Sequence, residues 1–147
     1  MFKEAQLRNI RIIALKGVLL AEDIYDDIET RKSSDIDVLV GKSDLRSMLM
    51  LVKELGYVKE NGENISLDMG DEFFNNPANT LHLPMWLKKV KVGSNKFINI
   101  PLEIHVELLH KSVHNLVDKE DVLTDKVIGR SKCSTIGDVV VRTLDLH

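Results

Sequence analysis

The segment Asp35–Val40 constrains the fold most strongly, because two acids alternate with aliphatic residues before the run becomes wholly aliphatic. A strand places successive side chains on opposite faces of a sheet, so Asp35 and Asp37 are expected to share one face. The other face is aliphatic and suits a core. The segment therefore predicts a strand that ends at Gly41, is buried on one side and presents two carboxylates on the other.

The segments around this strand predict strands and helices in alternation. Ile10–Leu15 is a short apolar run typical of a strand, and Val18–Ile28 has an apolar helical face. Ser43 can cap a helix that runs to Leu55, and Gly56 is expected to stop it.

The second half of the chain predicts hairpins. Tyr57–Met69 contains an Asn-Gly turn signal and predicts a short hairpin. Thr80–Val92 and Phe97–Leu109 are strand-like runs joined by Gly-Ser-Asn, and a proline within each indicates an edge or irregular section. Gly137–His147 predicts a short apolar helix or strand. Together these elements predict an α+β fold with one mixed β-sheet and helices mainly on one face, in a single domain spanning residues 1–147.

Charge and cysteine content narrow the classes of function. The net charge is −3 and the pI is near 5.9, so we expect no bulk binding to nucleic acid or to an anionic membrane. Any anionic substrate must then be bound locally, by metal ions, backbone N–H groups or a few basic side chains. Cys133 is the only cysteine, which excludes an internal disulfide and a cysteine-built zinc site. No apolar run suits a signal peptide or a membrane span, so we interpret the protein as cytoplasmic.

Asp35 and Asp37 are candidate metal ligands. Their Cα atoms would lie about 7 Å apart along a strand, so both carboxylates could contact a pair of cations about 4 Å apart. Without a cation the two charges would repel each other. The alternative is a solvated strand face or a turn with capping acids, which an isolated Asp-x-Asp signals more often. The aliphatic strand that follows and the Gly-led helix that precedes favour the metal site here.

Pro101–Leu109 is a second source of acidic side chains. Alternation places Glu103, His105 and Glu107 on one face of this strand. Neighbouring strands lie about 4.8 Å apart, so Glu103 could reach metals held by the aspartates. His105 could orient an acid, contact a phosphate or accept a proton. The alternative, an exposed polar face of an antiparallel sheet, stays open.

Basic residues supply candidate phosphate ligands. Lys16 and Gly17 follow the first predicted strand and open the first helix, whose N–H groups could bind phosphate. Arg31, in the polar loop before the acidic strand, is a second candidate, although a surface arginine is the simpler interpretation. The lysines of the Lys88–Lys91 run are interpreted as a solvated strand face rather than as an acceptor site.

Taken in order, these motifs resemble those of the uncharacterised nucleotidyltransferases. The runs that carry the resemblance are Ala14–Ala21, Tyr25–Asp26, Arg31, Asp35–Val40, Leu55–Tyr57, His82–Pro84 and Leu102–His105. The resemblance implies the nucleotidyltransferase fold of the polymerase-beta superfamily, with three carboxylates that bind two Mg²⁺ ions. It assigns this role to Asp35, Asp37 and Glu103. It places Lys16 and Gly17 where the superfamily usually has Gly-Ser, so a lysine charge would replace the serine contact to phosphate.

The resemblance implies an enzyme that transfers a nucleotidyl group from an NTP, most simply ATP, to an acceptor hydroxyl or to a protein. Mg²⁺ is the expected cofactor, and Mn²⁺ could replace it. The alternative is a non-catalytic nucleotidyltransferase-like module that acts with a partner protein, and a homodimer is also open. A zinc site through His82 and His105 is a weaker alternative, because two separated histidines are usually structural. The chain is shorter than the family members that it resembles, so we interpret it as a truncated or minimal form.

Overall fold

The computed structural model describes residues 1–15, 35–68, 83–106, 124–136 and 138–144. Within these ranges the chain forms helices and strands whose order gives an α+β fold. The helices are α1 (Phe2–Leu7), the 3₁₀ helix η2 (Lys42–Asp44), α3 (Leu45–Glu54) and α5 (Thr124–Arg130). The strands are β1 (Ile12–Ala14), β2 (Ile36–Val40), β3 (Val58–Lys59), β4 (Trp86–Val92), β5 (Lys96–His105), β6 (Lys132–Ile136) and β7 (Val139–Thr143).

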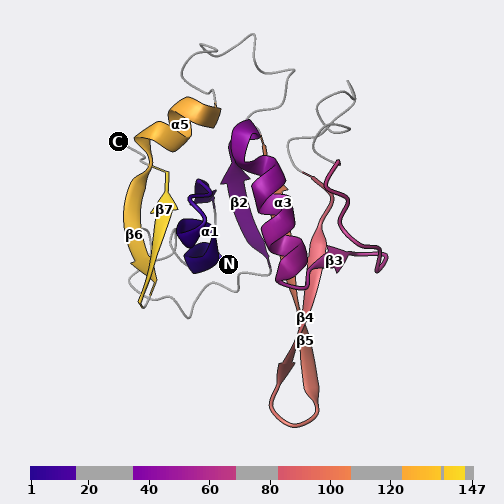
Figure 1. Cartoon of the computed structure of the whole chain (residues 1–147). Helices are drawn as coiled ribbons and strands as arrows, with labels where there is room; N and C mark the ends of the chain where they lie inside the picture. Colours follow the sequence, from indigo (N-terminus) through magenta and orange to yellow (C-terminus); the bar gives the residue numbers. More distant parts are fainter. Residues whose placement is uncertain (16–34, 69–82, 107–123, 137, 145–147) are drawn as a thin grey trace, which may run out of the picture.

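The described strands form one seven-stranded sheet in the order β3-β4-β5-β2-β1-β7-β6 (Figure 1). The central strand β2 pairs antiparallel with β1 and parallel with β5. β1 and β7 are also parallel, and the other neighbours are antiparallel. The predicted mixed sheet is therefore confirmed, and the two acidic segments predicted from the sequence lie side by side at its centre.

One face of the sheet carries the larger core, beneath α1 and α3. Val38 and Val40 of β2 reach this core together with Leu102 and Ile104 of β5, and all four are fully buried. The residues that α3 buries in the same core are Leu45, Met48, Leu49, Leu51 and Val52. Removing an aliphatic side chain of this size from water contributes about 1.5–3 kcal/mol. The aliphatic face of the predicted acidic strand is thus what fixes β2 to the helical layer.

The opposite face of the sheet carries a smaller apolar cluster and the acidic side chains. Ile13 of β1 and Leu39 of β2 pack against Ile128 of α5. Asp37 lies on this face because it is two residues from Leu39 in an extended strand. Among the described elements, α1 and α3 share one face and α5 contacts the other, which agrees with helices mainly on one face.

The start of α3 differs from its prediction. Ser43 does not cap the helix, because it lies within η2 and its hydroxyl accepts a hydrogen bond from Arg11 Nη2 at 2.9 Å. The 3₁₀ turn begins the helical segment instead, with the Asp44 N–H donating to the Gly41 carbonyl at 3.0 Å. A tighter turn of this kind satisfies backbone groups at a helix terminus that a side-chain cap would otherwise satisfy.

The predicted end of α3 at Gly56 is confirmed. Gly56 has a φ of +81°, a conformation that residues with a Cβ rarely adopt. Its N–H donates to the Lys53 carbonyl at 3.0 Å, and the Tyr57 N–H donates to the Val52 carbonyl at 3.1 Å. These two bonds form a Schellman motif, which ends a helix and turns the chain back toward the sheet.

The predicted hairpin at Tyr57–Met69 is wrong. The Asn-Gly turn is present, with the Lys59 N–H donating to the Glu63 carbonyl at 2.9 Å. Among the described residues of this segment only two form a strand, and they pair with β4, where Val58 lies opposite Leu87. After the turn Ile65 is buried in the main core and Leu67 packs against it, but these residues pair with no described strand.

Other segments depart from the sequence prediction in their bounds. β1 lies within the predicted strand Ile10–Leu15, and the apolar run at Gly137–His147 contains strand β7. α1, α5 and β6 were not predicted, because short, mixed-polarity segments lack an extended apolar period. The predicted helix Val18–Ile28 lies outside the described residues.

Candidate active site

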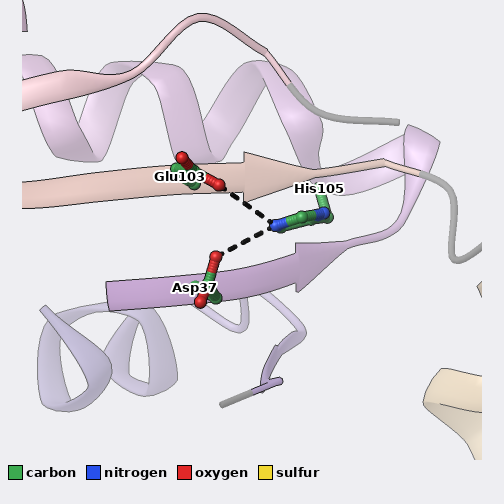
Figure 2. A group of neighbouring side chains, drawn as sticks. All are labelled: Asp37, Glu103 and His105. Carbon is green, nitrogen blue, oxygen red and sulfur yellow. Dashed lines mark hydrogen bonds and ion pairs between the residues drawn. The ribbon is translucent and has the colours of Figure 1, made fainter. Parts of the chain in front are cut away.

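The parallel pair of β2 and β5 forms the centre of the site. Its register places Asp37 directly opposite Glu103, and Leu39 opposite His105. Residues opposite each other project from the same face of a sheet. Asp37, Glu103 and His105 therefore share the face away from α3 (Figure 2). This is the register predicted for Glu103, and a shift by one residue would have presented Leu102 in its place.

The three side chains converge on one small volume. His105 Nε2 lies 3.1 Å from Asp37 Oδ1, a hydrogen-bond distance, and 3.7 Å from Glu103 Oε2. One ligand atom from each residue lies within 4.8 Å of the other two. Figure 2 shows the imidazole reaching across from β5 to the carboxylate on β2. Adjacent strands thus gather two acids and a histidine that are separated by 66 and 68 positions in the chain.

Burial differs sharply between the two carboxylates. The Asp37 side chain is 1% exposed, whereas Glu103 is 18% and His105 is 13% exposed. A buried carboxylate costs several kcal/mol unless hydrogen bonds or a positive charge compensate for the lost hydration. His105 supplies one such hydrogen bond. Asp37 therefore forms the floor of the site, and Glu103 and His105 form the part that meets solvent.

The donor set fits a divalent cation. Carboxylate oxygens suit Mg²⁺ and Mn²⁺, and ligand oxygens lie about 2.1 Å from Mg²⁺, so two of them around one ion are at most about 4.2 Å apart. A cluster within 4.8 Å reaches that spacing by small side-chain rotations. Asp37 and Glu103 are the natural ligands for such an ion. His105, which already contacts both, is suited to orient them.

Asp35 lies at the entry to the central strand. It occupies a bend directly before β2, which begins at Ile36. It is partly buried and is not one of the three residues whose ligand atoms lie within 4.8 Å. The way the chain enters β2 decides where this carboxylate points, and its role as a metal ligand stays a prediction.

The predicted phosphate ligands Lys16, Gly17 and Arg31 lie outside the described residues, as do His82 and Glu107. His105, for which the sequence left three roles open, lies against both acids. The signal for this contact was the alternation of Glu103 and His105 on one face, but only the pairing partner of β5 could turn it into a position.

The fold and the cluster define an α+β protein with a carboxylate-rich site on the less covered face of its sheet. Over residues 1–146 the sequence matches the family described as uncharacterised nucleotidyltransferase. The chain belongs to this family, as its motifs predict, and membership supports nucleotidyl transfer as its general chemistry. No curated protein and no solved structure matches the sequence. None of the described helices is both long and apolar enough to span a membrane.

Proposed function

We propose that the protein is a divalent-metal-dependent nucleotidyltransferase that moves a nucleotidyl group from an NTP to an acceptor hydroxyl. The convergence of Asp37 and Glu103 from neighbouring strands is the observation that carries this proposal. Two carboxylates side by side are unfavourable unless a positive group lies between them. Membership of a nucleotidyltransferase family suggests that this positive group is a divalent cation that takes part in nucleotidyl transfer.

Asp37 and Glu103 would hold the cations, with Asp35 as the third carboxylate of a two-ion site. When bound, Mg²⁺ ions stabilise the charge that develops on the attacking and leaving oxygens. In the reaction the acceptor oxygen bonds to the α-phosphorus of the NTP, and the bond from that phosphorus to the β-phosphate oxygen breaks. Pyrophosphate and one proton are released.

The fold holds the carboxylates of the site in fixed positions. Asp37 lies in the central strand of the sheet, and sites built on strands hold their geometry better than sites built on loops. The hydrogen bond from His105 restricts rotation of the Asp37 carboxylate. We therefore regard His105 as a positioning residue for the carboxylate pair.

The triphosphate requires further donors, because a chain of net charge −3 attracts no polyanion by its overall charge. Lys16, the N–H groups that follow Gly17 and Arg31 are the proposed phosphate contacts, and ATP is the simplest NTP. The non-catalytic alternative is not favoured, since a module without metal chemistry gains nothing from burying Asp37 beside a second acid.

Metal-dependent ATP binding tests the proposal. Isothermal titration of the wild type with ATP is expected to show binding in Mg²⁺ and little in EDTA. Asp37→Asn keeps the side-chain shape and should weaken the Mg²⁺-dependent affinity for ATP by about 10- to 100-fold or more. A loss of about 10- to 100-fold is typical even when a residue that only supports a metal ligand is changed. The matched control is Asp68→Asn, which removes the same charge from a side chain that is 76% exposed. Equal affinity of wild type and Asp37→Asn would contradict the proposed site.

A further inference from the structure

On the N-terminal side of Pro101, β5 and its partner β4 form a two-stranded ribbon that projects from the sheet (Figure 1). Residues 88–100 contain four lysines and no acid, whereas the rest of the chain has 16 Lys and Arg against 23 Asp and Glu. The ribbon is thus a basic arm on an acidic body. All residues from Lys91 to Asn99 are exposed, and none of the four lysines forms an ion pair with a described residue.

The two sides of this basic arm (residues 88–100) carry different side chains. Lys89 lies opposite Asn99, and Lys91 lies opposite Phe97, so these four residues share one side. The Lys89 ammonium lies 4.9 Å from the centroid of the Phe97 ring, which confirms the shared side. The other side carries Lys88 and Lys96 together with aliphatic residues, including Val92 and Ile98. Each side therefore presents two ammonium groups, but only the side with Lys89 and Lys91 adds the exposed aromatic ring of Phe97.

The side of the arm that carries Lys89, Lys91 and Phe97 is continuous with the candidate active site. The β4–β5 register has no bulge, and β5 runs without interruption from Lys96 to His105. Alternation therefore places Phe97 and Asn99 on the same side of β5 as Glu103 and His105. At about 3.3 Å per residue, Asn99 lies about 13 Å and Phe97 about 20 Å from Glu103 along the strand. The ribbon twists along this length, as two-stranded ribbons do, but the side leads directly to the carboxylates.

We propose that the basic arm binds a single-stranded nucleic acid and leads its terminal hydroxyl to Asp37 and Glu103. Lysines bind phosphates without demanding a particular sequence, and an exposed aromatic ring stacks on any base. The combination of Lys89, Lys91 and Phe97 on one side matches this chemistry. An acidic protein surface fits less well, because protein interfaces are depleted in lysine.

This inference rests on the proposed function, for which it names the acceptor class. The oxygen of the strand's terminal hydroxyl would bond to the α-phosphorus of the NTP, while pyrophosphate and a proton are released. The expectation from net charge, that the protein has no bulk affinity for nucleic acid, still applies to the body. A charge averaged over 147 residues conceals the separation of a positive arm from a negative remainder.

Fluorescence anisotropy with a labelled 20-nucleotide single strand tests the arm, in EDTA at about 50 mM salt. Wild type is expected to bind. Lys89→Ala/Lys91→Ala should weaken binding by more than about tenfold and flatten the log–log salt dependence by about 1.4, since each single-strand phosphate contact contributes about 0.7. Phe97→Ala should weaken it by about 5- to 150-fold, the range for loss of one stacked base. The matched control, Lys3→Ala/Lys53→Ala, removes two exposed lysines from α1 and α3 and should bind like the wild type.

Three results would overturn the inference. They are no binding by the wild type, an equal loss in the Lys3/Lys53 control, and equal affinity for a 20-residue polyglutamate, which would indicate an acidic protein partner. Because strand binding is measured without metal, its outcome is independent of the ATP titration. If the protein binds the single strand but shows no Mg²⁺-dependent ATP binding, the role of the arm is supported and the proposed enzymatic function is contradicted. If it binds ATP with Mg²⁺ but not the single strand, the enzymatic function is supported and the role of the arm is contradicted.

Discussion

The two halves of β5 have similar alternation but opposite environments. Ile98 and Ile104 project to the same side of one continuous strand, yet Ile98 is 41% exposed and Ile104 is fully buried. The difference in exposure follows from the strands and helices that lie beside each half. The half that begins at Leu102 pairs with β2 and contributes to the core beneath α3, whereas the half before it pairs with β4 alone. One half therefore provides stability and a rigid site, and the other provides a surface.

Pro101 marks the boundary between the two halves. A proline has no N–H to donate and is found in strands mainly at edges or irregular positions. The pairing of β2 with β5 begins at Leu102, the next residue. Pro101 therefore pairs with β4 but not with β2. This agrees with the edge or irregular section predicted from the proline.

The largest expected effect comes from the matched pair Ile104→Ala and Ile98→Ala. Ile104→Ala should lower the free energy of unfolding by about 2–5 kcal/mol, because it leaves a cavity in the main core. Ile98→Ala should change it by less than about 0.5 kcal/mol, as expected for an exposed position. Urea unfolding followed by circular dichroism measures both values. Similar losses for the two variants would mean that the arm is packed in solution and would break the comparison.

The second expected effect concerns metal-linked stability in the buried half of β5. At a Mn²⁺ concentration 100 times its Kd, the wild type should gain about 2.7 kcal/mol, which raises Tm by about 5–10 °C for a protein of this size. Glu103→Gln should lose most of this gain, because it removes one of the two carboxylates that face each other. Glu60→Gln, at an exposed turn position, is the control and should keep it. A Glu103→Gln protein with the full Mn²⁺ shift would show that the ion binds elsewhere.

The smallest expected effect lies where the body meets the arm. Burial raises the pKa of Tyr57 above its ordinary value of 10.0, and the Lys88 ammonium lies 5.9 Å from its ring centroid. A raised pKa in the folded state means that the neutral phenol stabilises the fold fully below pH 10 and that this contribution is lost as the pH rises further. Tyr57→Phe should therefore lose less stability between pH 9 and pH 11 than the wild type. Parallel pH profiles from chemical unfolding would exclude a contribution from this phenol.

The sequence alone determined the local features, because each rests on a preference of a few adjacent residues. Alternation predicted the buried and acidic faces of β2. Gly56 predicted the end of α3 because the left-handed conformation there favours glycine. The Gly-Ser-Asn turn predicted the β4–β5 hairpin, where Gly93 has a φ of +70°. The short elements α1, α5 and β6 escaped prediction because their few apolar residues show no extended period.

Only the tertiary structure decided which acids meet. The sequence placed Asp35 and Asp37 together by strand alternation and offered Glu103 as a third acid, and the β2–β5 register brings Glu103 and His105 to Asp37. Register between strands far apart in sequence depends on the packing of both faces at once, and a shift of one residue reverses every side chain. The same packing decided that one half of β5 is buried and the other exposed. Local preference specifies which side chains share a face, but the neighbours that the whole fold provides decide what that face meets.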